Sequence, residues 1–385
     1  MKSVHEAQRL ILANVKPLPL INIPLSRALG HLLMEDIKSD RDQPPFNKSL
    51  MDGIAINSAN NKRSFIIEEV IAAGHKPYRL INPNHCVQIM TGSPLPQGCD
   101  AIIPIEQVNI ENDLATLNDY VTFKPKQFIR YQASDAKKGQ VLLKSGTQLL
   151  SVHIGVLASV GKATVKVMAK PLVAVISTGD ELVDINKPIK PYQTRLSNSY
   201  ALKALLEQSG LVADVNIFHL KDNKAQMLKA LTKILKEFDM IVLSGGVSMG
   251  DFDFVPHVLT QLKVKSLFHQ VAQKPGRPFW FGITRDKKPV FALPGNPVST
   301  QICAYRYIIP YLRQLFGLKI KQEFIKLSEN VNITSDLTHF LPVKDGKVIA
   351  IGGSGDFAAL AQADGFIEYD SAKNENLRPY FSWRV

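Results

Sequence analysis

The chain of 385 residues has very little cysteine and no long apolar run. Its three cysteines, Cys86, Cys99 and Cys303, form no CxxC pair and are odd in number, which excludes a disulfide scaffold and favours buried thiols in a reducing compartment. No apolar stretch approaches the roughly 20 residues that cross a bilayer. The first 20 residues carry charges within an amphipathic helical pattern, unlike a signal peptide. We therefore expect a cytoplasmic protein.

Several nucleotide and metal motifs are also missing. There is no GxxxxGK[ST] loop, no GxGxxG after a strand, no HExxH pair and no GxSxG turn. These absences argue against a P-loop nucleotide site, a dinucleotide fold, a zinc or iron centre and a serine hydrolase. We expect His257 and His269 to be structural or surface residues.

The charge is strongly of one sign, at +12. A basic balance favours anionic partners such as nucleic acid, phosphates or oxyanions. The lysines are spread along the chain, and the sequence has no RGG tract, RNP-like motif or dense basic block. We therefore expect small anionic ligands and no nucleic-acid partner.

The hydrophobic pattern of the sequence changes several times along the chain, as expected for an α/β multidomain protein. We predict an N-terminal linker domain from residues 1–45 and 141–169, a β-rich domain at 46–140, an α/β domain at 170–318 and a small β-domain at 319–385. In the third segment, apolar strands without alternation take turns with amphipathic helices. That pattern is typical of a doubly wound domain whose parallel sheet is covered on both faces.

Polar, glycine-rich loops follow the strands of this domain. Ligands bind at the carboxyl ends of parallel strands, and glycines let backbone N–H groups approach an anion. An ordinary tight turn explains one such loop but not four, so we favour a phosphate-containing ligand. The expected binding residues are Gly179, Asp180, Ser244, Gly245, Gly246, Ser248, Lys274, Arg277, Pro294, Gly295, Asn296 and Ser299.

Acidic side chains in these loops suggest a metal. Asp180, Glu181, Asp251 and Asp253 are hard oxygen donors of the kind that bind Mg²⁺ against phosphates. We expect Mg²⁺ as a cofactor, with Asp251 and Asp253 as its ligands.

The β-rich half adds two polar turns beside strands. One contains Asp52 and Gly53, and the other contains Thr91 and Gly92. A hairpin turn explains either turn taken alone. Together they could close a pocket completed by another domain or subunit.

Ordered motifs along nearly the whole chain resemble the molybdopterin molybdenumtransferase family, MoeA, which is related to the E domain of gephyrin. They include NKSLMDGIAI, IMTGSPLPQGCDAIIP, VAVISTGDELV, VLSGGVSMGDFDFV, VAQKPGRPFWFG, LPGNPVS and GGSGDFAALAQADGFI. The order of STGDEL, SGGVSMGD, KPGRP and LPGNPVS is the most specific part of this resemblance.

The resemblance implies insertion of molybdate into adenylylated molybdopterin, with Mg²⁺ and release of AMP. It implies a MogA-like α/β domain and a homodimer in which the β-rich domain of one subunit completes the cleft of the other. A MogA-type adenylyltransferase is a further expected partner. The implied catalytic residues are Asp52, Thr91 and Asp135 on the β-rich side, and Glu181 and Asp253 on the α/β side. Lys274, Arg277 and Ser299 would hold molybdate.

Some positions depart from the family pattern. Leu196 stands where an acid commonly precedes Ser-Asn, and Gln270 stands where a lysine is often found. Arg277 replaces a lysine and keeps its charge. Further variant positions are Asn47, Lys48, Ile54, Ala133 and Ser134. The loss of an acid at Leu196 leaves weakened turnover, altered metal geometry or a divergent role open.

Two alternatives remain beside the insertase. One is a molybdopterin adenylyltransferase, which the additional β-rich domains disfavour. The other is a binding or scaffold protein that keeps the fold without turnover. Retention of Glu181, Asp253 and Lys274 argues against the scaffold.

Overall fold

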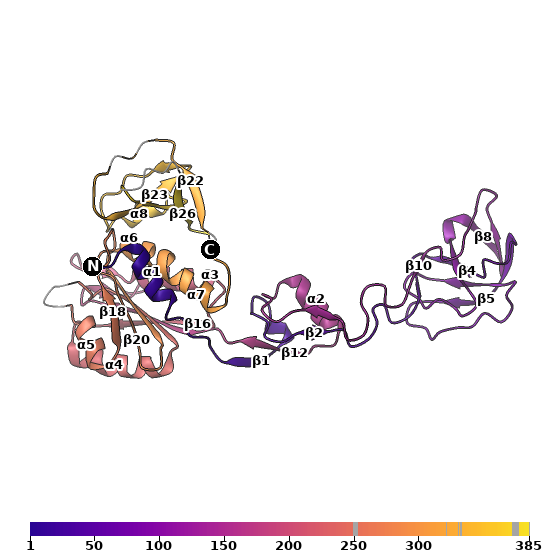
Figure 1. The fold of residues 1–385 in the computed structure, drawn as a ribbon, viewed down its shortest axis with the longest axis horizontal. Coiled ribbons are helices and arrows are strands. Elements are labelled where there is room, and N and C mark those ends of the chain that lie inside the picture. The colour runs from indigo at the N-terminus through magenta and orange to yellow at the C-terminus, as the bar shows by residue number, and fades with distance from the viewer. Residues whose placement is uncertain (249–252, 321, 330, 332, 372–376, 385) are drawn as a thin grey trace. The chain divides into compact units, whose positions relative to one another are not determined.

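The computed structural model describes all residues except 249–252, 321, 330, 332, 372–376 and 385. The chain divides into two compact units, whose elements are labelled in Figure 1. The first unit holds residues 1–22, 30–32 and 166–385, and the second holds 23–29 and 33–165. The chain passes between the units within β1 (Leu20–Pro24), on either side of residues 30–32, and within β12 (Thr164–Met168). The two units do not follow the predicted linker domain, because residues 1–22 of it lie in the first unit and residues 33–45 lie in the second. The four-domain division of the sequence stays a prediction.

The first unit is built on a six-stranded sheet with the order β16-β13-β17-β21-β20-β18. The first four strands are parallel neighbours, and β20 and β18 join antiparallel. β17 and β21 are buried along their whole length, so this sheet matches the predicted α/β domain. The strands are β13 (Leu172–Thr178), β16 (Asp214–Leu220), β17 (Met240–Ser244), β18 (Lys265–His269), β20 (Trp280–Ile283) and β21 (Pro289–Leu293).

Helices cover both faces of this sheet (Figure 1). On one face lie α4 (Lys224–Glu237) and α5 (Val255–Gln261), which contact each other. On the other face, α3 (Ser197–Gln208) contacts α6 (Pro297–Cys303), and α1 (Val4–Leu12) contacts α7 (Ile309–Leu315). A π-helical stretch, Ala304–Ile308, joins α6 to α7. Each fully buried aliphatic side chain of this core contributes about 1.5–3 kcal/mol.

The backbone between β18 and Lys274 is not one continuous strand. β18 ends at His269, and Gln270 takes a positive φ of 78°, which breaks the extended backbone. The chain then forms β19 (Gln273–Lys274), which pairs with a different sheet. His269 remains tied to the α/β site, because its Nε2 lies 2.8 Å from the Val247 carbonyl oxygen.

This second sheet of the unit has the order β19-β23-β25-β26-β22. A buried ion pair joins it to the helical layer, with Arg306 Nε 2.8 Å from Glu368 Oε2. Removing one partner of such a pair costs about 3–5 kcal/mol, because the other charge stays buried. The remaining elements are β22 (Glu323–Lys326), β23 (Thr338–Lys344), β24 (Lys347–Val348), α8 (Phe357–Leu360), β25 (Gly365–Tyr369) and β26 (Leu377–Ser382).

The second unit contains a six-stranded sheet with the order β7-β4-β6-β5-β9-β8. Gly53 opens β4 at a close approach, where an added Cβ would lie 1.9 Å from the Ile103 carbonyl oxygen. The sheet strands are β4 (Gly53–Ile56), β5 (Ser64–Ile71), β6 (Cys86–Ile89), β7 (Ala101–Pro104), β8 (Val108–Glu111) and β9 (Leu114–Leu117). Outside it lie β2 (Ile37–Lys38), β3 (Lys48–Ser49), β10 (Ile129–Arg130), β11 (Val141–Leu143) and α2 (Ser151–Ser159).

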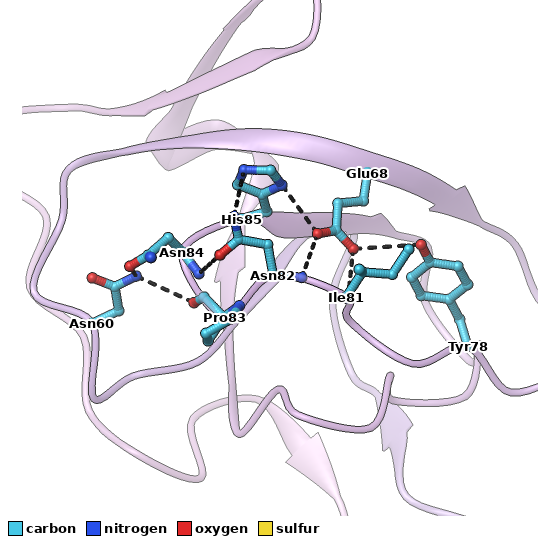
Figure 2. Close-up of polar contacts among 8 residues, drawn as sticks. All are labelled: Asn60, Glu68, Tyr78, Ile81, Asn82, Pro83, Asn84 and His85. Carbon is cyan, nitrogen blue, oxygen red and sulfur yellow. Dashed lines mark hydrogen bonds and ion pairs between the residues drawn. The ribbon is translucent and has the colours of Figure 1, made fainter.

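Glu68 on β5 organises the loop that leads to β6, as Figure 2 shows. Its Oε1 lies 3.0 Å from His85 Nδ1 and accepts the Asn82 N–H at 2.7 Å, while its Oε2 accepts the Ile81 N–H at 2.8 Å. Burial works to raise the pKa of Glu68, but the two N–H groups and His85 together hold that pKa below its ordinary value. Glu68 is therefore ionised, and its carboxylate holds this loop in place through these bonds.

Candidate functional site

Three neighbouring parallel strands of the first unit end at one edge of the sheet. β13 pairs with β17, and β17 pairs with β21, so Thr178, Ser244 and Leu293 finish side by side. The polar loops predicted as the site begin at these ends. Backbone bonds connect them, since the Gly245 N–H donates to the Leu293 carbonyl oxygen at 3.1 Å. Gly179 similarly donates to Leu220 at the end of β16.

The loop after β17 requires its two glycines. Gly245 and Gly246 have φ values of 97° and 66°, which side-chain-bearing residues rarely adopt. A Cβ on Gly246 would lie 2.8 Å from Thr178 Oγ1, and one on Gly245 would lie 2.8 Å from the Thr178 carbonyl oxygen. Glycine thus lets the backbone pass directly over the end of β13. Ser248 in this loop is exposed, whereas Asp251 lies outside the described residues.

Carboxylates gather at the same edge, and one of them was not predicted. Burial raises the pKa of Asp222, and the nearby charges of Asp180, Glu181 and Asp253 raise it further. The Asp222 N–H also contacts Asp180 Oδ1 at 3.4 Å. Asp222 follows the end of β16 by two residues, so the rule that located the other loops applies to it as well.

The fit of these carboxylates to Mg²⁺ is incomplete. They are oxygen donors that suit the ion, and their mutual repulsion is what a cation would relieve. Yet the described residues contain no group of three or more potential ligands placed to hold a metal. Since Asp251 is not among the described residues, the predicted Asp251–Asp253 pair stays a prediction.

The basic residues of the predicted site follow β18, with Lys274 at the end of β19 and Arg277 in the loop after it. Lys274 and Arg277 are exposed, while Gln273 is fully buried and donates from Nε2 to the Gly276 carbonyl oxygen at 3.1 Å. Lys274 is the strand partner of His339 on β23. Burial and then the charge of Lys274 lower the pKa of His339, so this imidazole is neutral at pH 7.

The loop after β21 is stabilised by residues that the sequence did not single out. Asn198 Nδ2 lies 2.7 Å from the Gly295 carbonyl oxygen and 2.9 Å from Ser244 Oγ. Thr300 Oγ1 donates to the Pro294 carbonyl oxygen at 2.7 Å. Ser299, predicted to bind the oxyanion, is buried at the start of α6. These contacts join the start of α3 to two of the predicted loops.

The end of this loop is joined to the C-terminal sheet layer. Asn296 Nδ2 donates to Ser354 Oγ at 2.7 Å, and the Val298 N–H donates to the Ser354 carbonyl oxygen at 3.1 Å. Ser354 belongs to the GGSGD stretch, so two motifs far apart in sequence meet here.

In the second unit, the structure brings two of the three predicted residues together. Asp52 Oδ1 accepts both the hydroxyl and the backbone N–H of Thr91 at 2.6 Å, and these bonds lower the pKa of Asp52. Asp135 instead forms an exposed ion pair with Arg130, at 2.7 Å from NH2, and this pair lowers its pKa. At pH 7 both groups are carboxylates.

The structure shows the environment of two residues that depart from the family pattern, Leu196 and Gln270. Leu196 is 5% exposed and precedes α3, where it provides no side-chain cap. A buried apolar side chain therefore replaces the carboxylate expected there. Gln270 occupies the positive-φ position after β18, and its backbone N–H donates to Phe279.

Comparisons with known proteins cover the whole chain. Residues 2–161 match the MoeA N-terminal region (domain I and II), and residues 174–314 match a probable molybdopterin binding domain. The molybdopterin molybdenumtransferase of Synechocystis sp. is 35% identical over 400 residues, covering 100% of both chains. That of Staphylococcus epidermidis is also 35% identical, over 95% of this chain and 90% of the relative.

A solved structure agrees with these relatives. The molybdopterin biosynthesis MoeA protein from Pyrococcus horikoshii superposes with a TM-score of 0.82 at 27% identity, covering 100% of this chain and 99% of that one. In the part of the chain that the structure describes, no helix is both long enough and apolar enough to cross a membrane. The resemblance found in the motifs is confirmed: the chain belongs to the MoeA family of molybdopterin molybdenumtransferases.

Proposed function

We propose that this protein inserts molybdate into adenylylated molybdopterin, forming molybdenum cofactor and releasing AMP. The observation that carries this function is the convergence of the β13, β17 and β21 loops at one edge of the α/β sheet, within a chain of this family. Backbone N–H groups of the glycine loops are suited to phosphate, and exposed Lys274 and Arg277 are suited to a dianionic oxyanion.

The predicted residues divide into three tasks. Lys274, Arg277 and Ser299 bind molybdate by charge-assisted hydrogen bonds, and the glycine loops bind the adenylate phosphate. The predicted catalytic residues act on the reacting groups; they are Asp52, Thr91, Asp135, Glu181 and Asp253. Mg²⁺, the predicted cofactor, would screen the phosphate charge and make AMP a better leaving group.

The test is a reconstituted assay with adenylylated molybdopterin, molybdate and Mg²⁺. We expect consumption of the adenylate and release of AMP. Asp253→Ala should abolish Mg²⁺-dependent cofactor formation while the circular dichroism spectrum stays unchanged. Glu237→Ala, an exposed acid on α4 paired with Lys233, is the matched control. Full activity in Asp253→Ala would remove Asp253 from the mechanism.

The same assay separates the alternatives. Formation of the adenylate from molybdopterin and ATP would instead identify an adenylyltransferase. Failure to bind either adenylylated molybdopterin or molybdate would favour a scaffold role.

We also propose a homodimer, supported by an uncovered apolar surface on the second unit. Helix α2 is apolar on all sides, yet only Leu157 of this helix is buried. Leu29, Leu150 and Val152 are 60%, 54% and 67% exposed. A helix that is apolar all round is normally covered, and a second copy of this chain is the occupant we propose. We also propose a cytoplasmic location and a MogA-type partner protein, both of which the sequence analysis predicts.

A further inference from the structure

Two side chains hold the loop after β21 from its inner side. The Thr300 hydroxyl donates to the carbonyl oxygen of Pro294, and the Asn198 amide donates to that of Gly295, each at 2.7 Å. The two donors also contact each other, with Asn198 Nδ2 3.2 Å from Thr300 Oγ1. Thr300 is fully buried and Asn198 is half-buried, so both carbonyls are directed toward this pair of side chains.

The direction of these carbonyls determines the direction of the next two N–H groups. The cis peptide bonds found in the described residues lie elsewhere, so both peptide bonds of this loop are trans. In a trans peptide the C=O and the following N–H point in opposite directions. The N–H groups of Gly295 and Asn296 therefore both point away from the part-buried Asn198–Thr300 contact.

These two N–H groups are available to a ligand. Gly295 and Asn296 are exposed, and neither backbone N–H has a hydrogen-bond partner among the described residues. The Gly295 Cα faces the neighbouring glycine loop, since an added Cβ would lie 3.4 Å from Gly245 Cα. Adjacent N–H donors at the edge of a sheet form a concave site for an anionic oxygen.

We propose that the N–H groups of Gly295 and Asn296 bind a phosphate oxygen, and that Asn198 and Thr300 are positioning residues that aim them. This inference rests on the proposed function, in which the anion is the phosphate of the adenylate. Neither side chain touches the ligand. Each acts by preventing its peptide plane from turning, which would replace an N–H donor with a carbonyl oxygen.

The test uses AMP and the full chain labelled with ¹⁵N. We expect the Gly295 and Asn296 amide resonances to shift on titration with AMP. Thr300→Val keeps the shape of the side chain but removes its hydroxyl, and should weaken AMP binding about tenfold, equivalent to about 1.4 kcal/mol. Asn198→Ala should weaken it by at least as much, and Thr300→Ser should restore it.

Ser199→Ala is the matched control. Ser199 lies on the same helix as Asn198, but its buried hydroxyl contacts Ser177 at 2.5 Å and not the loop. This variant should lose stability while AMP binding stays within twofold. The inference is overturned if wild-type protein does not bind AMP, if the two amides do not shift, or if Thr300→Val binds AMP as tightly as Ser199→Ala.

A turnover assay on the same samples separates this inference from the proposed function. Wild-type protein that binds AMP with these shifts and variant effects, but does not consume adenylylated molybdopterin with molybdate, would keep the phosphate site and remove the insertase.

Discussion

Asp222 shows how folding changes the chemistry of a single side chain. Burial and the neighbouring Asp180, Glu181 and Asp253 disfavour its ionised form, so its folded pKa is raised above the ordinary 3.8. An acid with a raised folded pKa lowers stability as the pH increases from its unfolded pKa through its folded pKa. This residue therefore carries a stability cost at neutral pH, as is common at binding sites.

Replacing Asp222 with Asn should remove that cost. We expect Asp222→Asn to melt at a higher temperature than wild type at pH 7, by up to a few degrees, because the repulsion is gone. The gain should disappear near pH 3, where the wild-type carboxyl is also neutral. Thermal melts at both pH values check this, and equal melting at pH 7 would contradict the electrostatic explanation.

The pKa of Glu68 is shifted in the opposite direction to that of Asp222. Its folded pKa is lowered, so the stability it contributes is present above its ordinary pKa of 4.5 and is lost as the pH falls through the folded value. Glu68→Gln should destabilise the protein by about 1–2 kcal/mol at pH 7, because a neutral amide replaces an acceptor of two backbone N–H groups.

Urea denaturation at pH 7 and pH 3 measures this difference, which should shrink at the lower pH. Glu69→Gln is the neighbouring control, since Glu69 is exposed on the same strand. A constant difference at both pH values would show that shape, and not charge, explains the effect of Glu68.

At the scale of the element, β16 is one of the two edge strands of the α/β sheet, and side chains protect its outer side at Val215. Lys203 Nζ donates to the Val215 carbonyl oxygen at 2.9 Å, and Asp214 Oδ1 accepts the Val215 N–H at 2.8 Å. Side chains thus occupy both backbone groups of Val215, near the start of this strand. Charged residues at sheet edges commonly prevent such pairing.

Removing this protection should promote self-association. We expect the double variant Lys203→Ala, Asp214→Ala to form larger species at high concentration, measured by light scattering. Lys229→Ala, an exposed lysine on α4, should behave like wild type. If the double variant keeps the wild-type size at every concentration, the edge is protected by other means.

For the whole molecule, the uncovered surface of α2 leads to a prediction about assembly. Val152→Asp should convert the proposed homodimer to a monomer, because a charge would be buried at the apolar contact. Sedimentation equilibrium gives the mass directly. Ile81→Asp is the control, since Ile81 is 81% exposed in the same unit but lies in the loop between β5 and β6 and not on α2. A wild-type monomer would contradict the homodimer.

The sequence alone determined the α/β class, the family and the strand ends that carry the loops. Apolar runs without alternation identified β13, β17 and β21, and glycine with acidic residues marked where they end. These features are local, because the spacing of apolar residues and the φ values that glycine allows are properties of a few consecutive residues. The rule about strand ends could also have found Asp222, whose only sequence signal is its place after β16.

Only the tertiary structure decided what those loops contact. Asn198 and Thr300 are ordinary polar residues in sequence, and their importance arises because α3, β17 and β21 meet at one point. The early end of β18, the Arg306–Glu368 pair and the contact of Ser354 with Asn296 likewise join segments far apart in the chain. Such contacts depend on packing in three dimensions, which a linear pattern of residue types does not encode.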